Sequence, residues 1–252
     1  MGIVLNEREF ALDAINNLDL GEHPSETLGR IARYYRSEGY AKREIRGLLE
    51  SFVVKCDPSR NAVMWDRTID KQMSMVDKFK LVELDNIPIS KKEIEVCNSL
   101  AGKQARRLLF ALICVAKYNN AVSKKNNGWV NVADKEGFRM ANIVTPTRRQ
   151  SLMLGDLRDA GLIRFSKKVD NININVLCLD DDPDSEVALR VTDYRNLGYQ
   201  YLRYCGEPYF ECRSCGIVVK RGSNVQKYCH ECAVDINRQN NRENYRNMVR
   251  AQ

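Results

Sequence analysis

Four cysteines near the C-terminus form two pairs whose spacing could bind a metal ion. Cys212 and Cys215 make one Cys-x-x-Cys pair, and thirteen residues separate it from a second pair, Cys229 and Cys232. Four thiolates at this spacing are typical of a closed tetrahedral zinc site, which leaves no coordination position open for catalysis. The sequence therefore predicts one structural Zn²⁺ ion.

The residues around these pairs indicate how the chain would hold the ion. Gly216 can adopt the positive φ that a zinc knuckle requires, and 217–219 is apolar enough for a strand. A loop follows at 220–226, and a polar helix is predicted from Ala233 onward. A knuckle, a hairpin and a ligand pair in a first helical turn together predict a treble-clef zinc ribbon. Metal binding would supply on the order of 10 kcal/mol of folding free energy to this small module.

Basic charge is concentrated in two blocks of the chain. The sequence has 40 Lys and Arg against 33 Asp and Glu, a net charge of +7. Residues 101–150 carry ten basic and two acidic groups, and residues 201–252 carry nine and five, whereas 1–100 and 151–200 are net acidic. Such blocks commonly bind a phosphate backbone, although two solvated faces would give the same counts.

Helical periodicity indicates the elements that must position these groups. Apolar residues at i, i+3, i+4 and i+7 predict one helix from Pro24 and a second around 45–52. A third, from Ile94 to Tyr118, is apolar nearly all round between Leu108 and Ala116, which predicts a central buried helix.

The segment that follows has a characteristic order of elements. A short strand is predicted at 129–132 and a helix at 134–142. Another helix is predicted to begin at Thr145-Pro146, with Thr145 as N-cap, and to end before Gly161. Two strands, 162–166 and 172–179, then flank a turn. This order predicts a winged helix-turn-helix.

The helix after Pro146 would be the recognition element of such a domain. At 100° per residue, Met153, Leu157 and Ala160 face the core. The opposite side, with the first helical turn and the tip of the wing, carries the residues predicted to contact nucleic acid: Arg148, Arg149, Ser151, Arg158, Lys167 and Lys168. Winged helices also serve as protein-docking modules, and that alternative stays open.

A second set of predicted nucleic-acid contacts lies in the cysteine-rich region and its trailing helix. These residues are Lys220, Arg221, Arg238, Arg242, Arg246 and Arg250. The last four recur every fourth residue and so form one stripe along a helix, which favours phosphate binding. A solvated helix that orders only against a partner would show the same pattern.

The sequence contains few residues suited to catalysis. It has two histidines and none of the Gly-x-x-x-x-Gly-Lys, Gly-x-Ser-x-Gly or His-Glu-x-x-His motifs. We therefore expect that the protein is not an enzyme. The chain shows no signal-peptide pattern and no apolar run of about 20 residues, so a cytoplasmic location without membrane association is expected, with the other cysteines as reduced thiols.

The predicted fold class is α+β and mostly α. A helical domain is expected at 1–88, a winged-helix domain at 89–185, a connecting strand and helix at 186–208, and a zinc-ribbon module with a basic C-terminal helix at 209–252.

Parts of the chain resemble a family of phage and prophage proteins from Gram-positive bacteria. The resemblance covers roughly residues 90–235 and is carried by 129–131, 157–171, 195–202 and the cysteine pairs. It implies a small mobile-element protein with a C-terminal zinc ribbon that works in the host cytoplasm. It implies no activity and no catalytic residues.

Two functional hypotheses follow. The first is a zinc-binding, nucleic-acid-binding phage protein that regulates transcription or replication, with duplex DNA as the favoured partner and a homodimer suited to a palindromic site. The alternative is an interaction protein that binds and inhibits a host protein or ribonucleoprotein complex, such as a CRISPR effector. Phosphate binding should weaken steeply with salt, whereas a desolvated protein interface should be less sensitive.

Overall fold

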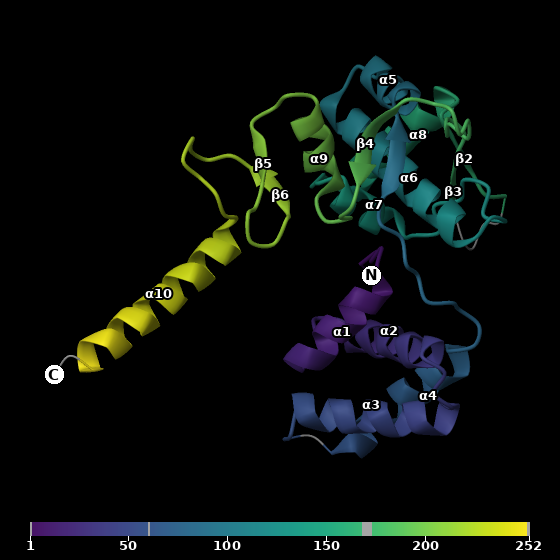
Figure 1. Ribbon diagram of the computed structural model, residues 1–252. Helices are drawn as coiled ribbons and strands as arrows, with labels where there is room; N and C mark the ends of the chain where they lie inside the picture. The colour runs from purple at the N-terminus through teal and green to yellow at the C-terminus, as the bar shows by residue number, and fades with distance from the viewer. Residues whose placement is uncertain (1, 60, 168–172, 251–252) are drawn as a thin grey trace. The chain divides into compact units, whose positions relative to one another are not determined.

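A computed structural model describes residues 2–59, 61–167 and 173–250 (Figure 1). The protein is an α+β chain that is mostly helical, with a few short strands and a cluster of cysteines near its C-terminus. It divides into two compact units, Met1–Asn86 and Ile87–Gln252. Within the described residues, no helix combines the length and the apolar character needed to cross a membrane.

The first unit is helical. It consists of α1 (Glu7–Asn17), α2 (Pro24–Ser37), α3 (Lys42–Cys56), the 3-10 helix η1 (Ala62–Trp65) and α4 (Asp66–Met75). The two helices predicted from periodicity are α2 and α3, and their apolar faces meet in one core.

Several charges of this unit are paired inside it. Glu7 is 5% exposed, and its carboxylate accepts hydrogen bonds from the Arg33 guanidinium, with Nε at 2.9 Å. Arg36 and Lys42 both pair with Asp77, and Arg46 pairs with Asp70. These arginines are therefore neutralised by their own unit.

The second unit is built around one buried helix. Nine consecutive residues of α6 (Lys103–Val122), from Leu108 to Ala116, are buried. The elements packed against α6 include α5 (Lys91–Ser99), α7 (Asp134–Met140), α8 (Thr147–Asp159) and α9 (Leu197–Tyr204). The predicted central helix is confirmed over 108–116.

The prediction of a single helix from Ile94 to Tyr118 was wrong in one respect. This segment forms two helices, α5 and α6. The chain leaves the helical conformation at Leu100, whose carbonyl oxygen accepts a 2.6 Å hydrogen bond from Arg106 Nε. The break lets the fully buried Glu93 carboxylate reach Lys117 Nζ at 2.9 Å. One continuous helix would hold residues 24 positions apart about 36 Å from each other.

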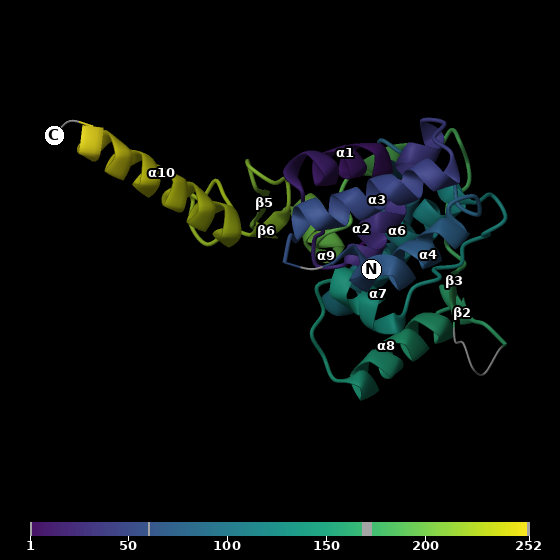
Figure 2. The same ribbon diagram turned by 90° about the horizontal axis from the view of Figure 1, so that it is seen from below.

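The elements after α6 follow the predicted order with shifted ends. Helices α7 and α8 precede an antiparallel pair of strands, β2 (Ile163–Phe165) and β3 (Ile174–Val176), as Figure 2 shows. Helix α8 begins at Thr147 with Pro146 as its N-cap, so the helix begins one residue later than predicted. Gly161 ends α8 with φ +72°, as expected for a C-terminal glycine.

The strand predicted at 129–132 is reduced to a single bridge between Trp129 and Asn175 of β3. Val130 N adds a 2.8 Å hydrogen bond to Ile174 O. Asn131 then adopts φ +53°, which turns the chain away and ends the pairing. The resulting order of paired segments is Trp129, β3, β2.

The region predicted as a connection, 186–208, contributes two elements to the second unit. Strand β4 (Val187–Val191) pairs antiparallel with β1 (Ile87–Ser90), with Ile87 opposite Val191. Helix α9 packs against α6, where the Tyr201 and Phe110 rings lie 5.3 Å apart. The chain then forms β5 (Tyr209–Glu211), β6 (Val218–Lys220) and α10 (His230–Arg250).

The N-terminus of α9 touches the backbone that joins α7 to α8. A Cβ atom at Gly198 would lie 2.0 Å from the carbonyl oxygen of Ala141, so only glycine fits this approach. Asn142 Nδ2 donates to Asn196 Oδ1 at 2.7 Å, and Asn142 Oδ1 accepts from Tyr199 N at 3.2 Å. This contact fixes α9 relative to α7.

We therefore expect Gly198→Ala to lower the free energy of unfolding by about 2–3 kcal/mol, because a backbone carbonyl would have to move. Gly155→Ala is the matched control, since that helical glycine has open space around its Cβ position and alanine favours a helix. Urea unfolding of both variants measures the difference. Equal stability of the two would contradict the close approach.

Candidate metal centre and basic surfaces

The first cysteine pair lies in a turn at the end of the β5–β6 hairpin. Tyr209 pairs with Lys220 and Glu211 with Val218, so the two strands hold the turn between them. Cys212 N donates to Ile217 O at 2.9 Å, and Gly216 N donates to Cys212 O at 2.9 Å. Gly216 has φ +74°, as the sequence predicted for a knuckle.

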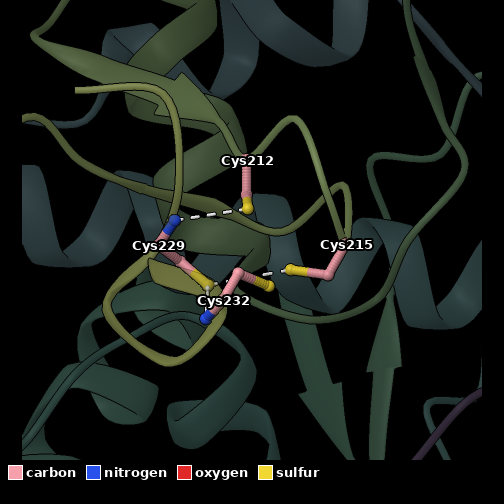
Figure 3. A group of neighbouring side chains, drawn as sticks. All are labelled: Cys212, Cys215, Cys229 and Cys232. Carbon is pink, nitrogen blue, oxygen red and sulfur yellow. Dashed lines mark hydrogen bonds between the residues drawn. The ribbon is translucent and has the colours of Figure 1, made fainter. Parts of the chain in front are cut away.

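The second pair joins the first through the start of α10. Cys229 directly precedes α10, and Cys232 lies in its first turn. Arg213 N donates to Lys227 O at 3.0 Å, which ties the two segments together. The four side chains thus come from the hairpin turn and from one helix end (Figure 3).

The four sulfur atoms converge at metal-binding distance. All Sγ atoms lie within 4.8 Å of one another, and those of Cys215 and Cys229 are 3.8 Å apart. A tetrahedral ion with metal–sulfur bonds near 2.3 Å would hold its ligands about 3.8 Å apart, whereas a disulfide needs about 2.0 Å. The donor set therefore fits a metal ion coordinated by four thiolates.

Backbone N–H groups favour the thiolate form at Cys212. Burial, the largest influence, would raise the pKa of this thiol. The N–H groups of Cys215, Cys229 and Ser214 outweigh burial and bring the pKa of Cys212 down from 9.0 to about 6. The N–H of Cys229 lies 3.2 Å from Cys212 Sγ. A thiolate is the form that binds metal ions.

Two residues that the sequence analysis missed connect the cysteine cluster to the helical core. Arg195 Nη2 donates to the carbonyl oxygen of Cys215 at 2.6 Å, and Asp193 holds the same guanidinium. The hydrogen bond that Arg195 donates to the Asp193 carboxylate, together with the nearby cysteines, raises the pKa of Arg195. Asn196 Nδ2 donates to Val218 O at 3.0 Å. No sequence pattern marked these two residues, because their partners in the hairpin lie 20 and 22 positions away.

The treble-clef prediction was wrong in the position of the hairpin. The sequence suggested a knuckle followed by a hairpin, but β5 precedes the knuckle and β6 follows it, so one hairpin encloses Cys212 and Cys215. The reason is pairing of Tyr209–Glu211 with 218–220, which leaves 221–229 as a loop. The helix predicted from Ala233 begins at His230.

The predicted contact residues of α8 are exposed. Arg148, Arg149, Ser151 and Arg158 all lie on the surface, while Met153, Leu154 and Leu157 are buried. Ala160 was predicted to face the core but is exposed, because the helix ends at Asp159 and Ala160 is its C-cap. Leu154, which was not predicted to face the core, is buried instead of Ala160.

The arginines of α8 differ in their partners. Arg148 and Arg149 form no ion pair within the described part of the chain. Arg158 pairs with Asp159 at 2.8 Å, and its guanidinium lies 5.9 Å from the centre of the Phe165 ring. Lys167 is exposed just after β2, and Lys168 lies outside the described residues.

The remaining predicted contacts lie in the C-terminal module. Lys220 ends β6 and is exposed, as is Arg221, whose guanidinium lies 5.7 Å from the Phe210 ring centre. On α10, Arg238, Arg242 and Arg246 are exposed, and Arg238 approaches Asp235 at 3.6 Å. Arg250 is the last residue of α10, and its side chain lies outside the described part.

The five cysteines outside the cluster differ in exposure. Cys205 is exposed, whereas Cys97 and Cys114 are buried and Cys56 and Cys178 are half-buried. Burial raises the pKa of Cys97 and Cys114, which keeps them as neutral thiols.

Comparison with known proteins identifies no relative of this chain, since no family model, curated protein or solved structure matches it significantly.

The cysteine geometry predicts that the chain binds one metal ion and that each pair is required. Cys212→Ser should lose the bound ion, because three thiolates cannot close the tetrahedral site. Cys205→Ser should retain it, because that thiol lies outside the cluster. Metal content per chain, measured after purification with Zn²⁺ and gel filtration, tests both. Full metal content in Cys212→Ser would contradict the assignment.

Proposed function

We propose that this protein binds nucleic acid, with duplex DNA as its favoured partner, and regulates transcription or replication. The observation that carries the proposal is the exposed face of α8. That face presents Arg148 and Arg149 without carboxylate partners in the described part of the chain. Unpaired arginines at a helix surface suit phosphate oxygens and guanine edges.

The arrangement around α8 supports assignment of residues 103–176 to a winged helix-turn-helix. Helices α6, α7 and α8 precede a β2–β3 hairpin, and the Trp129 bridge adds a third segment beside β3. In this class, the helix before the wing enters the major groove. Helix α8 holds that position here, with Lys167 on the wing.

Helix α8 is shaped for close approach to a partner. The Cβ position of Gly155 faces open space, so no side chain projects from the helix between Ser151 and Arg158 at this position. The buried side of α8 is anchored by Met153, Leu154 and Leu157, so the opposite side stays available. Arg158 can exchange its exposed Asp159 partner for a phosphate at small cost, because surface ion pairs are weak.

We infer that the bound metal is a single structural Zn²⁺ ion in a zinc-ribbon module. Four thiolates, sulfur separations near 3.8 Å and a closed donor set suit zinc better than Mg²⁺ or Ca²⁺, which prefer oxygen ligands. Zinc would supply coordination bonds that hold the hairpin against the start of α10. Lys220, Arg221 and the arginines of α10 would then provide further phosphate contacts.

The proposal places the protein among phage or prophage products that act in the host cytoplasm, without catalysis. Its support is the sequence resemblance described above and the absence of known catalytic motifs from the sequence. A homodimer would suit a palindromic site.

One observation favours the alternative of a protein that inhibits a host complex. Val144, just before α8, is fully exposed, and Leu152 on α8 is 62% exposed. Exposed apolar side chains beside arginines are also typical of protein-docking surfaces. The two hypotheses use the same helix and differ in their partner.

Duplex binding measured by fluorescence anisotropy tests the proposal. We expect the zinc-loaded protein to bind a random-sequence duplex and to lose two or more orders of magnitude in affinity between about 50 and 200 mM salt. Arg148→Glu combined with Arg149→Glu should weaken binding at least about 30-fold, because each arginine contact contributes about 1–3 kcal/mol.

The matched control is Lys78→Glu combined with Lys80→Glu, which makes the same charge change at two exposed lysines of the first unit. It should bind nearly as well as the parent protein. Absence of duplex binding at about 50 mM salt, or equal losses in both double variants, would refute α8 as the interface. Capture of a host protein complex that the α8 variant loses would then support the alternative.

A further inference from the structure

A basic groove lies beside the cysteine cluster, apart from the α8 surface. Its volume is about 540 Å³, within the range of ligand-binding pockets. Its lining includes Arg203, Tyr209, Phe210, Arg213, Arg221 and Lys227. Only Arg221 of these was predicted from the sequence to contact nucleic acid.

Backbone hydrogen bonds hold the two walls of this groove. One wall is the β5–β6 hairpin, and the other is the loop 221–228. Arg221 N donates to Pro208 O at 2.8 Å, and Arg213 N donates to Lys227 O at 3.0 Å. The Gln226 side chain ties the loop to itself by accepting from Gly222 N at 2.7 Å. The groove is therefore built into the fold of the cysteine module.

The charge of the groove is positive and incompletely balanced. Glu211, the one acidic residue of the lining, pairs with Arg203 at 2.7 Å. Arg213, Arg221 and Lys227 are exposed and have no carboxylate partner in the described part of the chain. These three cations line one groove, so an anion bound there would be attracted by all of them.

The aromatic side chains of the groove are already engaged. Tyr209 packs on Tyr199 with ring centres 4.8 Å apart, and Phe210 is 6% exposed with Arg221 over its ring. Phe210 is therefore nearly buried, and Tyr209 is half-buried with its ring against Tyr199. The groove therefore offers charge for phosphates and little surface for bases.

We propose that this groove binds the phosphodiester backbone of nucleic acid, independent of sequence, through Arg213, Arg221 and Lys227. This site deepens the proposed nucleic-acid function and rests on it. It adds Arg213 and Lys227 to the contact surface, and both residues lie within two positions of a cysteine of the cluster. The cation positions thus depend on the closed cysteine site.

The test compares binding of a short fluorescein-labelled oligothymidylate by the full zinc-loaded chain and by a triple variant, Arg213→Gln, Arg221→Gln and Lys227→Gln. A single strand has no double-helical grooves, so its binding measures contacts with the phosphodiester backbone without readout of base pairs. Loss of three phosphate contacts should make the slope of log K against log salt shallower by about 2. Affinity at about 50 mM salt should fall at least about 10-fold.

The matched control replaces Lys55, Lys78 and Lys80 by Gln, which removes the same charge from exposed positions of the first unit. Metal content of both variants confirms that the cysteine site remains closed. If the groove variant loses metal, the single variant Arg221→Gln, which is farther from the cysteines in sequence, carries the test with an expected slope change of about 0.7.

The proposal is overturned if the parent protein does not bind oligothymidylate at about 50 mM salt. It is also overturned if the groove and control variants share one affinity and one slope, or if polyglutamate competes as well as the oligonucleotide at equal charge. The Arg148→Glu, Arg149→Glu variant separates the two sites. In that variant, loss of duplex binding with oligothymidylate binding retained supports the groove as a site separate from α8. Loss of oligothymidylate binding in the same variant assigns the single strand to α8 and overturns the groove.

Discussion

The burial of α6 is the constraint on which the second unit depends. A helix that is apolar on every side from Leu108 to Ala116 must be covered on every side. Helices α5, α7, α8 and α9 provide much of that cover. Met153, Leu154 and Leu157 of α8 are buried on its inner side, so the arginines of α8 lie on its outer face. The basic surface of α8 is thus a consequence of core packing.

The same constraint extends to the cysteine module. Helix α9 packs on α6 and reaches the α7–α8 connection at Gly198, where its backbone comes close to Ala141. From the start of α9, Arg195 and Asn196 hold the carbonyl groups of Cys215 and Val218. A chain of contacts therefore runs from the buried helix to the hairpin that bears the first cysteine pair. The basic groove is lined by that hairpin and by Arg203 of α9.

Both units contain paired cations, and the second also presents unpaired cations on α8 and around the groove. In the first, Glu7 and Asp77 neutralise neighbouring arginines and lysines. In the second, Arg148, Arg149, Arg213, Arg221 and Lys227 have no carboxylate partner among the described residues. Net charge counted along the sequence could locate the basic blocks but could not distinguish paired from unpaired cations, since pairing depends on tertiary structure. The unpaired cations on α8 and in the groove are the observation behind the proposed phosphate-binding role.

Local patterns predicted much of this structure, and long-range contacts limited the rest. Cys-x-x-Cys spacing and Gly216 identified the cysteine cluster, and periodicity located α2, α3 and the buried part of α6. The break at Leu100 was missed because the contact that it allows, between Glu93 and Lys117, joins residues far apart in sequence. Strand β1 was missed because its four residues pair with β4 about 100 positions later. The groove cations Arg213 and Lys227 lack any periodic pattern, so only the folded hairpin and loop bring them together.

The most direct test of the central claim is arginine-selective labelling of the zinc-loaded protein with and without duplex DNA, read by mass spectrometry. Duplex DNA should protect Arg148 and Arg149 from a dicarbonyl reagent if α8 is the interface. Arg43, which is exposed on the first unit, serves as the internal reference and should react equally in both samples. Unchanged labelling of Arg148 and Arg149 at a DNA concentration that saturates binding would contradict the assignment of α8 as the interface.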